Sequence, residues 1–283
     1  AGETLHHTLG QLSWLSEQAS NTRQGLAVTH SLEVVSDQTS ERGRLLNKVK
    51  RALDEKTISL CAQPIQNAEG KGYHEILTRL VSEGEVMSPV QFIPVIAQFN
   101  LSVRFDMLVI ETLLQWMQAH PASSSQARFS VNLLPLTLMQ EDAGKQLVEL
   151  CTQYAISPAS IIIEVTEEQA FSNSEFSIRN IQHLRQSGFK IAIDDFGTGY
   201  ANFERLKRLE ADIVKIDGCF VRDIERDPQD VLIVKAICEL AKAKSLTVVA
   251  EYVETQEQRE LLLKAGVDYL QGYLLGKPQP LEK

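Results

Sequence analysis

From about residue 57 onward, short β-branched apolar runs alternate with longer segments of helical spacing, and this alternation constrains the fold more than any other feature. The apolar runs, which we interpret as strands, are Thr57–Gln63, Tyr73–Arg79, Arg128–Leu133, Ile161–Thr166, Lys190–Phe196, Ile213–Asp217, Thr247–Val253 and Tyr269–Gly272. Strands separated by helices predict a parallel sheet built from βα units. Eight such runs within about 225 residues predict an α/β fold of the TIM-like (β/α)8 barrel class.

An open, doubly wound sheet is the competing architecture. The Gly-rich phosphate fingerprint that is typical of a Rossmann unit is absent from the sequence, which favours the barrel.

Only the short turn region Asn67–Gly72 separates the first two runs, so a hairpin is predicted there and one strand is expected to be antiparallel. The expected helices are Phe105–Gln118, Leu136–Tyr154, Asn173–Ser187, Asp230–Ala243 and Gln256–Ala265.

The first 45 residues differ from the rest of the chain. They are polar, with weak helical segments at Leu9–Gln18 and Leu45–Leu53 and no alternation of strands and helices. We interpret residues 1–45 as a helical linker or the tail of an upstream domain, and residues 46–283 as one barrel domain. Because the chain begins Ala1-Gly2, we expect it to be a piece of a longer protein.

Composition narrows the function classes. The net charge of −9 argues against DNA or RNA as a partner, because nucleic-acid binding requires a basic surface. The four cysteines form no CxxC pair or Cys/His cluster, so neither a zinc site nor a disulfide framework is indicated. No apolar run approaches the roughly 18 residues that a membrane helix requires. We therefore expect a cytoplasmic domain, with any membrane anchor of the full-length protein in a missing N-terminal region.

Charged and amide side chains stand at or near the ends of most apolar runs. They are Glu75, Asn132, Glu164, Asp194, Asp195, Lys215, Asp217, Glu251 and Glu254. Burying an unpaired charge is costly, and the carboxyl ends of barrel strands form the active face of this fold class. We therefore expect these side chains to converge on one rim, although they are far apart in the sequence.

Several carboxylates at one place repel one another, and divalent cations remove that repulsion. Oxygen ligands favour Mg²⁺, Mn²⁺ or Ca²⁺, and a pair of such ions is the usual device for attack of water on a phosphodiester. Lys215 would then hold the attacking water and offset phosphate charge. The alternative is that these residues are helix caps or metal-free ion pairs with Lys215, Arg79 and Arg205, since a single carboxylate at a strand end usually has such a role.

The most distinctive string is Asp194-Asp-Phe-Gly-Thr-Gly-Tyr200, in which a doubled Asp precedes a Gly-x-Gly turn. With it, the chain resembles the EAL-domain phosphodiesterases over residues of about 50–280. The motifs that carry the resemblance, in family order, are Glu75-Ile-Leu-Thr-Arg79, Phe92-Ile-Pro, Val131-Asn-Leu, Glu164-Val-Thr-Glu167, Asp194-Asp-Phe-Gly-Thr-Gly, Lys215-Ile-Asp217, Ala250-Glu-Tyr-Val-Glu-Thr255 and Gln271-Gly-Tyr-Leu.

The resemblance implies a role for each matching residue. The implied ligands of two Mg²⁺ or Mn²⁺ ions are Glu75, Asn132, Glu164, Asp194 and Asp195, with Asp194 as the bridge. The implied catalytic residues are Lys215 and Asp217, which organise water, and Glu251, a candidate general base. The implied substrate contacts are Gln63, Leu77, Arg79 and Gln271. Glu167 is implied to hold the Asp194–Tyr200 loop in place.

The resemblance also implies the substrate, which is cyclic di-GMP (c-di-GMP), and the product, which is linear pGpG. It implies a homodimer and an upstream sensory or GGDEF-type domain in the full-length protein. The chain departs from the family pattern at Ile76, Asn100, Leu134 and Tyr252, where the family commonly has Ala, Gly, Ser and Gly, and it keeps every ligand position. Because Tyr252 adds bulk beside Glu251, a catalytically weak c-di-GMP receptor or scaffold is the alternative, and a phosphodiesterase for another small phosphodiester is a third reading.

Overall fold

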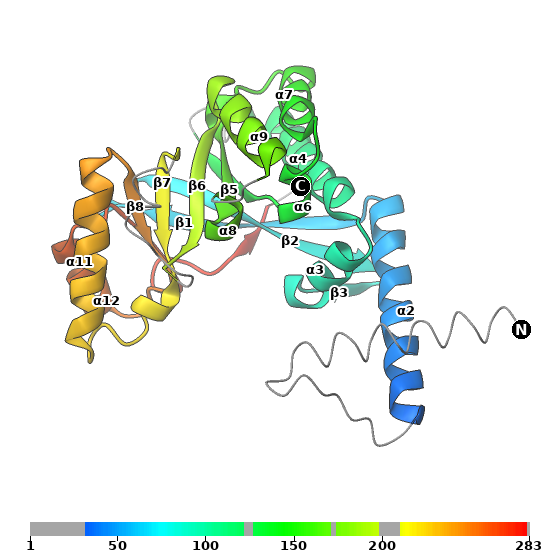
Figure 1. The fold of residues 1–283 in the computed structure, drawn as a ribbon, viewed down its shortest axis with the longest axis horizontal. Coiled ribbons are helices and arrows are strands. Elements are labelled where there is room, and N and C mark those ends of the chain that lie inside the picture. Colours follow the sequence, from blue (N-terminus) through cyan, green and yellow to red (C-terminus); the bar gives the residue numbers. More distant parts are fainter. Residues whose placement is uncertain (1–31, 122–126, 171–173, 198–209, 282–283) are drawn as a thin grey trace, which may run out of the picture.

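The computed structural model describes residues 32–121, 127–170, 174–197 and 210–281. In this part of the chain eight strands close into a barrel, with helices packed on its outside (Figure 1). The barrel strands are β1 (Ile58–Gln66), β2 (Gly72–Ser82), β4 (Phe129–Asn132), β5 (Ile161–Thr166), β6 (Lys190–Phe196), β7 (Ile213–Ile216), β8 (Thr247–Ala250) and β9 (Tyr269–Gln271). Their order is β1-β9-β8-β7-β6-β5-β4-β2, and the pairing of β2 with β1 closes the ring. The predicted barrel is confirmed.

Strand β1 is antiparallel to both of its barrel neighbours, whereas the other barrel pairings are parallel. The β1–β2 hairpin was expected from the short turn between the two runs. There the side chain of Asn67 accepts hydrogen bonds from the amides of Glu69 and Lys71. A Cβ at Gly72 would lie 1.7 Å from the Ile65 carbonyl oxygen, so only glycine fits where β2 begins. Two short strands, β3 (Glu85–Met87) and β10 (Gln279–Pro280), extend the sheet outside the ring.

The helices of the described residues connect the strands or flank them. They are α2 (Leu32–Asp54), α3 (Pro89–Gln98), α4 (Ser102–Ala119), α6 (Pro135–Leu138), α7 (Ala143–Gln153), α8 (Glu167–Ala170), α9 (Glu175–Gln186), α11 (Pro228–Ala243) and α12 (Gln256–Ala265), with two 3-10 turns, η1 (Pro158–Ser160) and η2 (Gly218–Phe220). In Figure 1, α11 and α12 lie beside β8, and α4, α7 and α9 group near β5 and β6. No helix in these ranges is both long and apolar enough to cross a membrane.

One predicted helix was wrong. The segment Leu136–Tyr154 forms two helices, α6 and α7, because a side chain from α9 holds the chain open between them. The side-chain nitrogen Nδ2 of Asn180 donates hydrogen bonds to the Leu138 and Gln140 carbonyls, and its side-chain oxygen Oδ1 accepts one from the Gly144 backbone amide. These bonds satisfy backbone groups that a continuous helix would have paired internally.

At the N-terminus, α2 runs through the predicted boundary at residue 45, so the division into residues 1–45 and 46–283 stays a prediction. The predicted helical segment Leu9–Gln18 lies outside the described residues.

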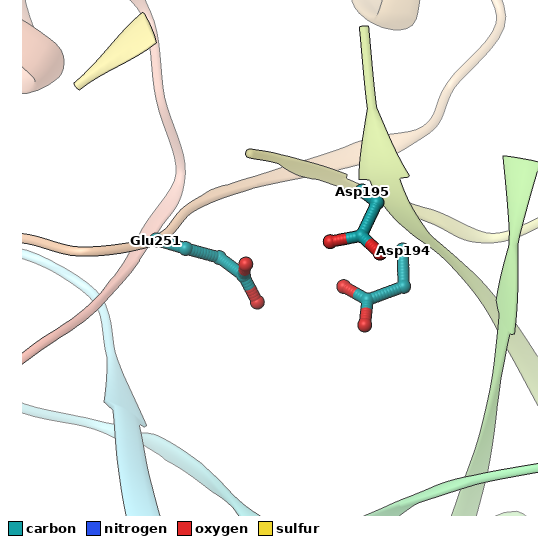
Figure 2. Close-up of side chains that lie close together, drawn as sticks. All are labelled: Asp194, Asp195 and Glu251. Carbon is teal, nitrogen blue, oxygen red and sulfur yellow. The ribbon is translucent and has the colours of Figure 1, made fainter. Parts of the chain in front are cut away.

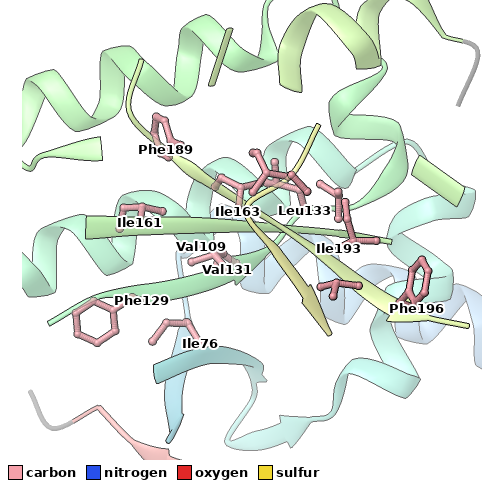
Figure 3. Close-up of a cluster of buried hydrophobic side chains, with 14 of the residues drawn as sticks. Ile76, Val109, Phe129, Val131, Leu133, Ile161, Ile163, Phe189, Ile193 and Phe196 are labelled. Atoms are coloured by element: carbon pink, nitrogen blue, oxygen red, sulfur yellow. The ribbon is translucent and has the colours of Figure 1, made fainter. Parts of the chain in front are cut away.

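The strands separate two apolar regions. Outward-facing side chains such as Ile76, Val131, Ile163 and Ile193 pack under the helices (Figure 3). Inward-facing side chains form a second, smaller cluster within the barrel, which we call the apolar floor. Its buried members are Ile65, Tyr73, Ile162, Ala192, Ile213 and Val249. Successive side chains of a strand alternate between its two faces, so a residue two positions from a floor residue on the same strand also points into the barrel.

Candidate active site

On the six barrel strands that contribute to the apolar floor, a polar side chain lies two residues along the chain from the floor residue, and we call these side chains the polar layer. The pairs, floor residue first, are Ile65 and Gln63, Tyr73 and Glu75, Ile162 and Glu164, Ala192 and Asp194, Ile213 and Lys215, and Val249 and Glu251. Residues two apart on a strand share a face, so these polar side chains point into the barrel as the floor does. The order of Gln63 and Ile65 is reversed because β1 is antiparallel, and Gln63 pairs in register with Glu75.

Lys215 lies at the centre of the polar layer and is fully buried. Its Nζ is 2.6 Å from Glu251 Oε1, 2.7 Å from Glu164 Oε2, 3.0 Å from Asp194 Oδ1 and 3.6 Å from Glu75 Oε2. Four carboxylates from β2, β5, β6 and the end of β8 therefore share one ammonium group. A single positive charge balances only one of them, so the site retains an excess of negative charge.

The excess negative charge changes proton affinities. Burial lowers the pKa of Lys215, but Asp194, Glu164, Glu251 and Glu75 outweigh it and hold that pKa well above its usual value, so the lysine stays protonated. Burial raises the pKa of Glu251 to about 8, with Lys215 opposing and Asp194 and Glu75 adding to the shift. Burial likewise raises the pKa of Glu164 well above its usual range.

Three carboxylates lie close enough to ligate one cation. One oxygen from each of Asp194, Asp195 and Glu251 lies within 4.8 Å of the others, and Figure 2 shows the three groups facing a common space. Consecutive residues of a regular strand point to opposite faces, but the β6–β7 register shifts between Ile193 and Phe196 and Asp195 has φ +53°. This irregularity brings Asp195 beside Asp194. Burial and the charges of Asp194 and Asp217 raise the pKa of Asp195.

Amide side chains surround Glu75. Asn132 Nδ2 donates to Glu75 Oε1 at 2.8 Å, and Gln271 Nε2 donates to Glu75 Oε2 at 2.5 Å. Gln271 also lies 3.3 Å from Gln63 Oε1, and Gln63 donates to the Gly276 carbonyl. The structure thus brings these predicted residues together with Glu75.

The remaining predicted residues lie at the edge of this cluster. Glu167 Oε2 accepts a hydrogen bond from the Gly197 amide, at the point where the described part of the Asp194–Tyr200 loop ends, and residues 198–200 lie outside the described residues. The Asp217 side chain accepts from the Cys219 amide and caps η2, so it is not among the four carboxylates that contact Lys215. Arg79 donates to the Thr78 carbonyl.

A cavity of about 400 Å³ opens on the polar layer. It is lined by Gln63, Glu75, Leu77, Arg79, Asp194, Glu251, Tyr252, Glu254, Gln271, Gly272, Tyr273 and Pro278. Sequence reasoning did not assign Gly272, Tyr273 or Pro278 to the site, although Gly272 and Tyr273 follow Gln271 in a motif that it singled out. A Cβ at Gly272 would lie 2.1 Å from the Val253 carbonyl oxygen, which explains the glycine.

The donor set fits hard divalent cations. Carboxylate and amide oxygens are the ligands that Mg²⁺, Mn²⁺ and Ca²⁺ prefer. Glu164 Oε1 is buried and makes no hydrogen bond with any described residue, which is costly unless a cation or water satisfies it. An unsatisfied buried oxygen beside an uncompensated carboxylate cluster is what a metal-binding site presents before the metal is added.

The fold and this site define a class of protein, and the chain belongs to the EAL domain family, whose model matches residues 46–278. The chain is 57% identical over 279 residues to the "Probable cyclic di-GMP phosphodiesterase PdeA" of Escherichia coli K12, a match that covers 99% of this chain and 38% of that protein. The chain thus spans less than half the length of that relative.

Two solved structures resemble the chain. The PaMucR phosphodiesterase in complex with c-di-GMP is 32% identical, with a TM-score of 0.77 over 84% of this chain and 98% of that one. The Klebsiella pneumoniae BlrP1 complex with manganese and c-di-GMP is 29% identical, with a TM-score of 0.70 over 79% of this chain and 56% of that one.

Proposed function

We propose that this chain hydrolyses c-di-GMP to linear 5′-pGpG in a reaction that depends on divalent metal ions. The observation that carries the proposal is the convergence of Glu75, Glu164, Asp194 and Glu251 on Lys215. Three of these carboxylates, Glu75, Asp194 and Glu251, line one cavity. The resemblance to proteins named as c-di-GMP phosphodiesterases supports the choice of substrate.

Metal binding follows from the same side chains. Glu75, Asn132, Glu164, Asp194 and Asp195 would hold two ions, Mg²⁺ or Mn²⁺, which when bound supply an activated hydroxide and neutralise charge on the phosphate. The manganese in the BlrP1 complex supports this choice of metal.

The chain's own residues would bind the substrate and move the proton. Glu251 lines the cavity beside Asp194 and Asp195, and it accepts the proton of the attacking water as general base. Lys215 and Asp217 orient that water, and the permanent charge of Lys215 also attracts the phosphate. Arg79 binds phosphate, and Gln63, Leu77 and Gln271 contact the nucleotide. Glu167 supports the loop that carries the metal ligands through its bond to Gly197.

The direct test is chromatography of c-di-GMP incubated with the protein and Mg²⁺ or Mn²⁺. We expect pGpG as the product, and a loss of at least about 10²-fold in rate for Glu251→Gln, which removes the base but keeps the shape. Glu257→Gln, on the exposed first turn of α12, is the matched control and should retain the wild-type rate. No pGpG with either metal would contradict the proposal.

A second candidate function is a c-di-GMP receptor of weak activity. It is favoured by Tyr252, which has φ +62° and lines the cavity directly after Glu251. Tight binding of c-di-GMP to the metal-loaded protein without formation of pGpG would support the receptor and reject the enzyme.

The assembly and cellular setting are also proposals. We propose a cytoplasmic homodimer in which residues 46–283 form the catalytic domain. In the longer protein it would follow an upstream sensory or GGDEF-type domain, to which residues 1–45 lead. Light scattering of the purified chain tests the dimer.

A further inference from the structure

Tyr252 is held in an unfavourable backbone conformation at the edge of the cavity. Its φ of +62° lies in the left-handed region, which is uncommon for a bulky residue that is not glycine. Its Cβ lies against the backbone of η2, where a Cβ at Gly218 would come within 2.8 Å of it. Strain of this kind persists where the surrounding structure fixes the residue, and it is concentrated at functional sites.

The ring of Tyr252 is fixed from one side by a cation. The guanidinium carbon of Arg222 lies 4.2 Å from the ring centroid, a short distance for a cation–π contact. The backbone around Arg222 is itself held, because the buried side chain of Gln258 donates to the Val221 and Arg222 carbonyls. Arg222 thus lies against one face of the ring.

The exposure of the ring fits a binding surface. Tyr252 is 47% exposed, although it adjoins Glu251 and lines the same cavity as Asp194. A phosphodiester bound at these carboxylates would carry its flanking nucleosides past the neighbouring residue. Aromatic side chains that flank such a path commonly stack on bases, because every base offers a π-face.

We propose that Tyr252 is a substrate-binding residue that stacks on a nucleobase of the substrate, and that Arg222 is a positioning residue that holds the ring. This inference rests on the proposed function, because it presupposes a nucleotide phosphodiester in the cavity. It also explains why a strained tyrosine occupies a position where glycine would meet no backbone penalty.

Three substitutions at position 252 separate stacking from stability. Tyr252→Phe keeps the aromatic ring, Tyr252→Leu keeps bulk without a π-face, and Tyr252→Gly removes both the ring and the strain. We expect the Gly variant to melt at a temperature at least as high as the wild type. A loss of substrate affinity in that variant is then a loss of recognition and not of folding.

The experiment measures kcat and KM for c-di-GMP hydrolysis in each variant with Mn²⁺. We expect Tyr252→Phe to keep the wild-type kcat and KM. In Tyr252→Leu and Tyr252→Gly the KM should be about tenfold higher, and kcat should change less than KM does. Arg222→Gln should raise KM less than Tyr252→Leu does, because the ring remains but is no longer held.

A second readout reports stacking directly. A cyclic dinucleotide with 2-aminopurine in place of one guanine is titrated with Ca²⁺-loaded protein, and stacking quenches its fluorescence. Quenching is expected with wild type and Tyr252→Phe, and its loss with Tyr252→Leu. If the wild type hydrolyses c-di-GMP but Tyr252→Leu keeps the wild-type KM and the quenching, the stacking proposal is contradicted and the proposed function stands. If the wild type neither binds nor hydrolyses c-di-GMP, the proposed function fails and the stacking proposal falls with it.

Discussion

The apolar floor and the polar layer lie two residues apart on the same strands, yet they have opposite character. On β5, Ile162 is a buried hydrocarbon and Glu164 is a fully buried carboxylate, and on β7 the pair is Ile213 and Lys215. The floor stabilises the barrel by removing apolar surface from water. The polar layer works against that stability, since it places like charges where solvent does not screen them.

The contrast between the two layers explains the raised carboxyl pKa values of the site and its affinity for a cation. The dry floor beneath the carboxylates is part of the burial that raises the pKa of Glu164 and Glu251 and makes a cation favourable. Without the floor, water would screen the four carboxylates and weaken their affinity for both Lys215 and metal. Stability and function are thus divided between neighbouring positions of each strand.

The largest effect should come from removing the only positive charge among the described residues of the polar layer. Lys215→Met leaves four carboxylates with no counter-charge, so we expect a loss of about 3–5 kcal/mol in the free energy of unfolding without metal. Mn²⁺ should restore much of the stability, but hydrolysis should stay at least about 10²-fold below wild type. Urea unfolding with and without Mn²⁺, together with pGpG formation, measures both quantities.

Lys190→Met on β6 is the matched control, because Lys190 forms a half-exposed ion pair with Asp212. Its cost should stay below about 1 kcal/mol. Equal losses of stability in the two variants would mean that Lys215 is not the counter-charge of the layer.

A substitution in the apolar floor should lower stability but leave most of the activity of each folded molecule. Ile162→Ala leaves a cavity in the barrel interior, so we expect about 2–4 kcal/mol of destabilisation in urea. The rate per folded molecule should fall by less than about tenfold, because the polar side chains remain. Ile178→Ala, at an exposed position of α9, should cost under about 0.5 kcal/mol. A fully folded but inactive Ile162→Ala protein would show that the two layers cannot be separated.

The smallest effect concerns a buried carboxylate outside the layer. Asp106 on α4 accepts hydrogen bonds from Thr137 and the Leu134 amide, and burial raises its pKa from 3.8 to about 7 despite them. The native state therefore keeps a proton that the unfolded chain releases, so this group lowers stability as pH rises from about 4 to 7.

Asp106→Asn should remove that loss. We expect it to match wild type near pH 4 and to be more stable by about 2 kcal/mol at pH 8, as followed by urea unfolding. An unchanged pH profile would show that Asp106 does not titrate in this range. Asp106 differs from the polar layer in this respect, because no lysine of the described residues balances its charge, whereas Lys215 balances part of the charge of the layer.

Much of this arrangement follows from the sequence because strand periodicity is local. Apolar runs with polar ends predict both the barrel and the rim at which those ends meet, and so they bring Glu164 and Lys215 together. Features that depend on contacts across the fold were not predictable in this way. The shift in β6 that brings Asp195 beside Asp194 has no local signature beyond the following glycines. Two further contacts join residues that are about 30 or 40 positions apart in the sequence. One is the contact of Arg222 with Tyr252, and the other is the bond of the Asn180 side chain to Gln140, which divides α6 from α7.

We infer that carboxylates from separate strands form one divalent-cation site. Calorimetric titration of Mn²⁺ into wild type and into Asp194→Asn, which keeps size and removes one charge, tests it most directly. We expect saturable binding to the wild type and an affinity at least about tenfold lower in the variant. Equal Mn²⁺ affinity in the two proteins, or no binding to the wild type, would contradict the claim.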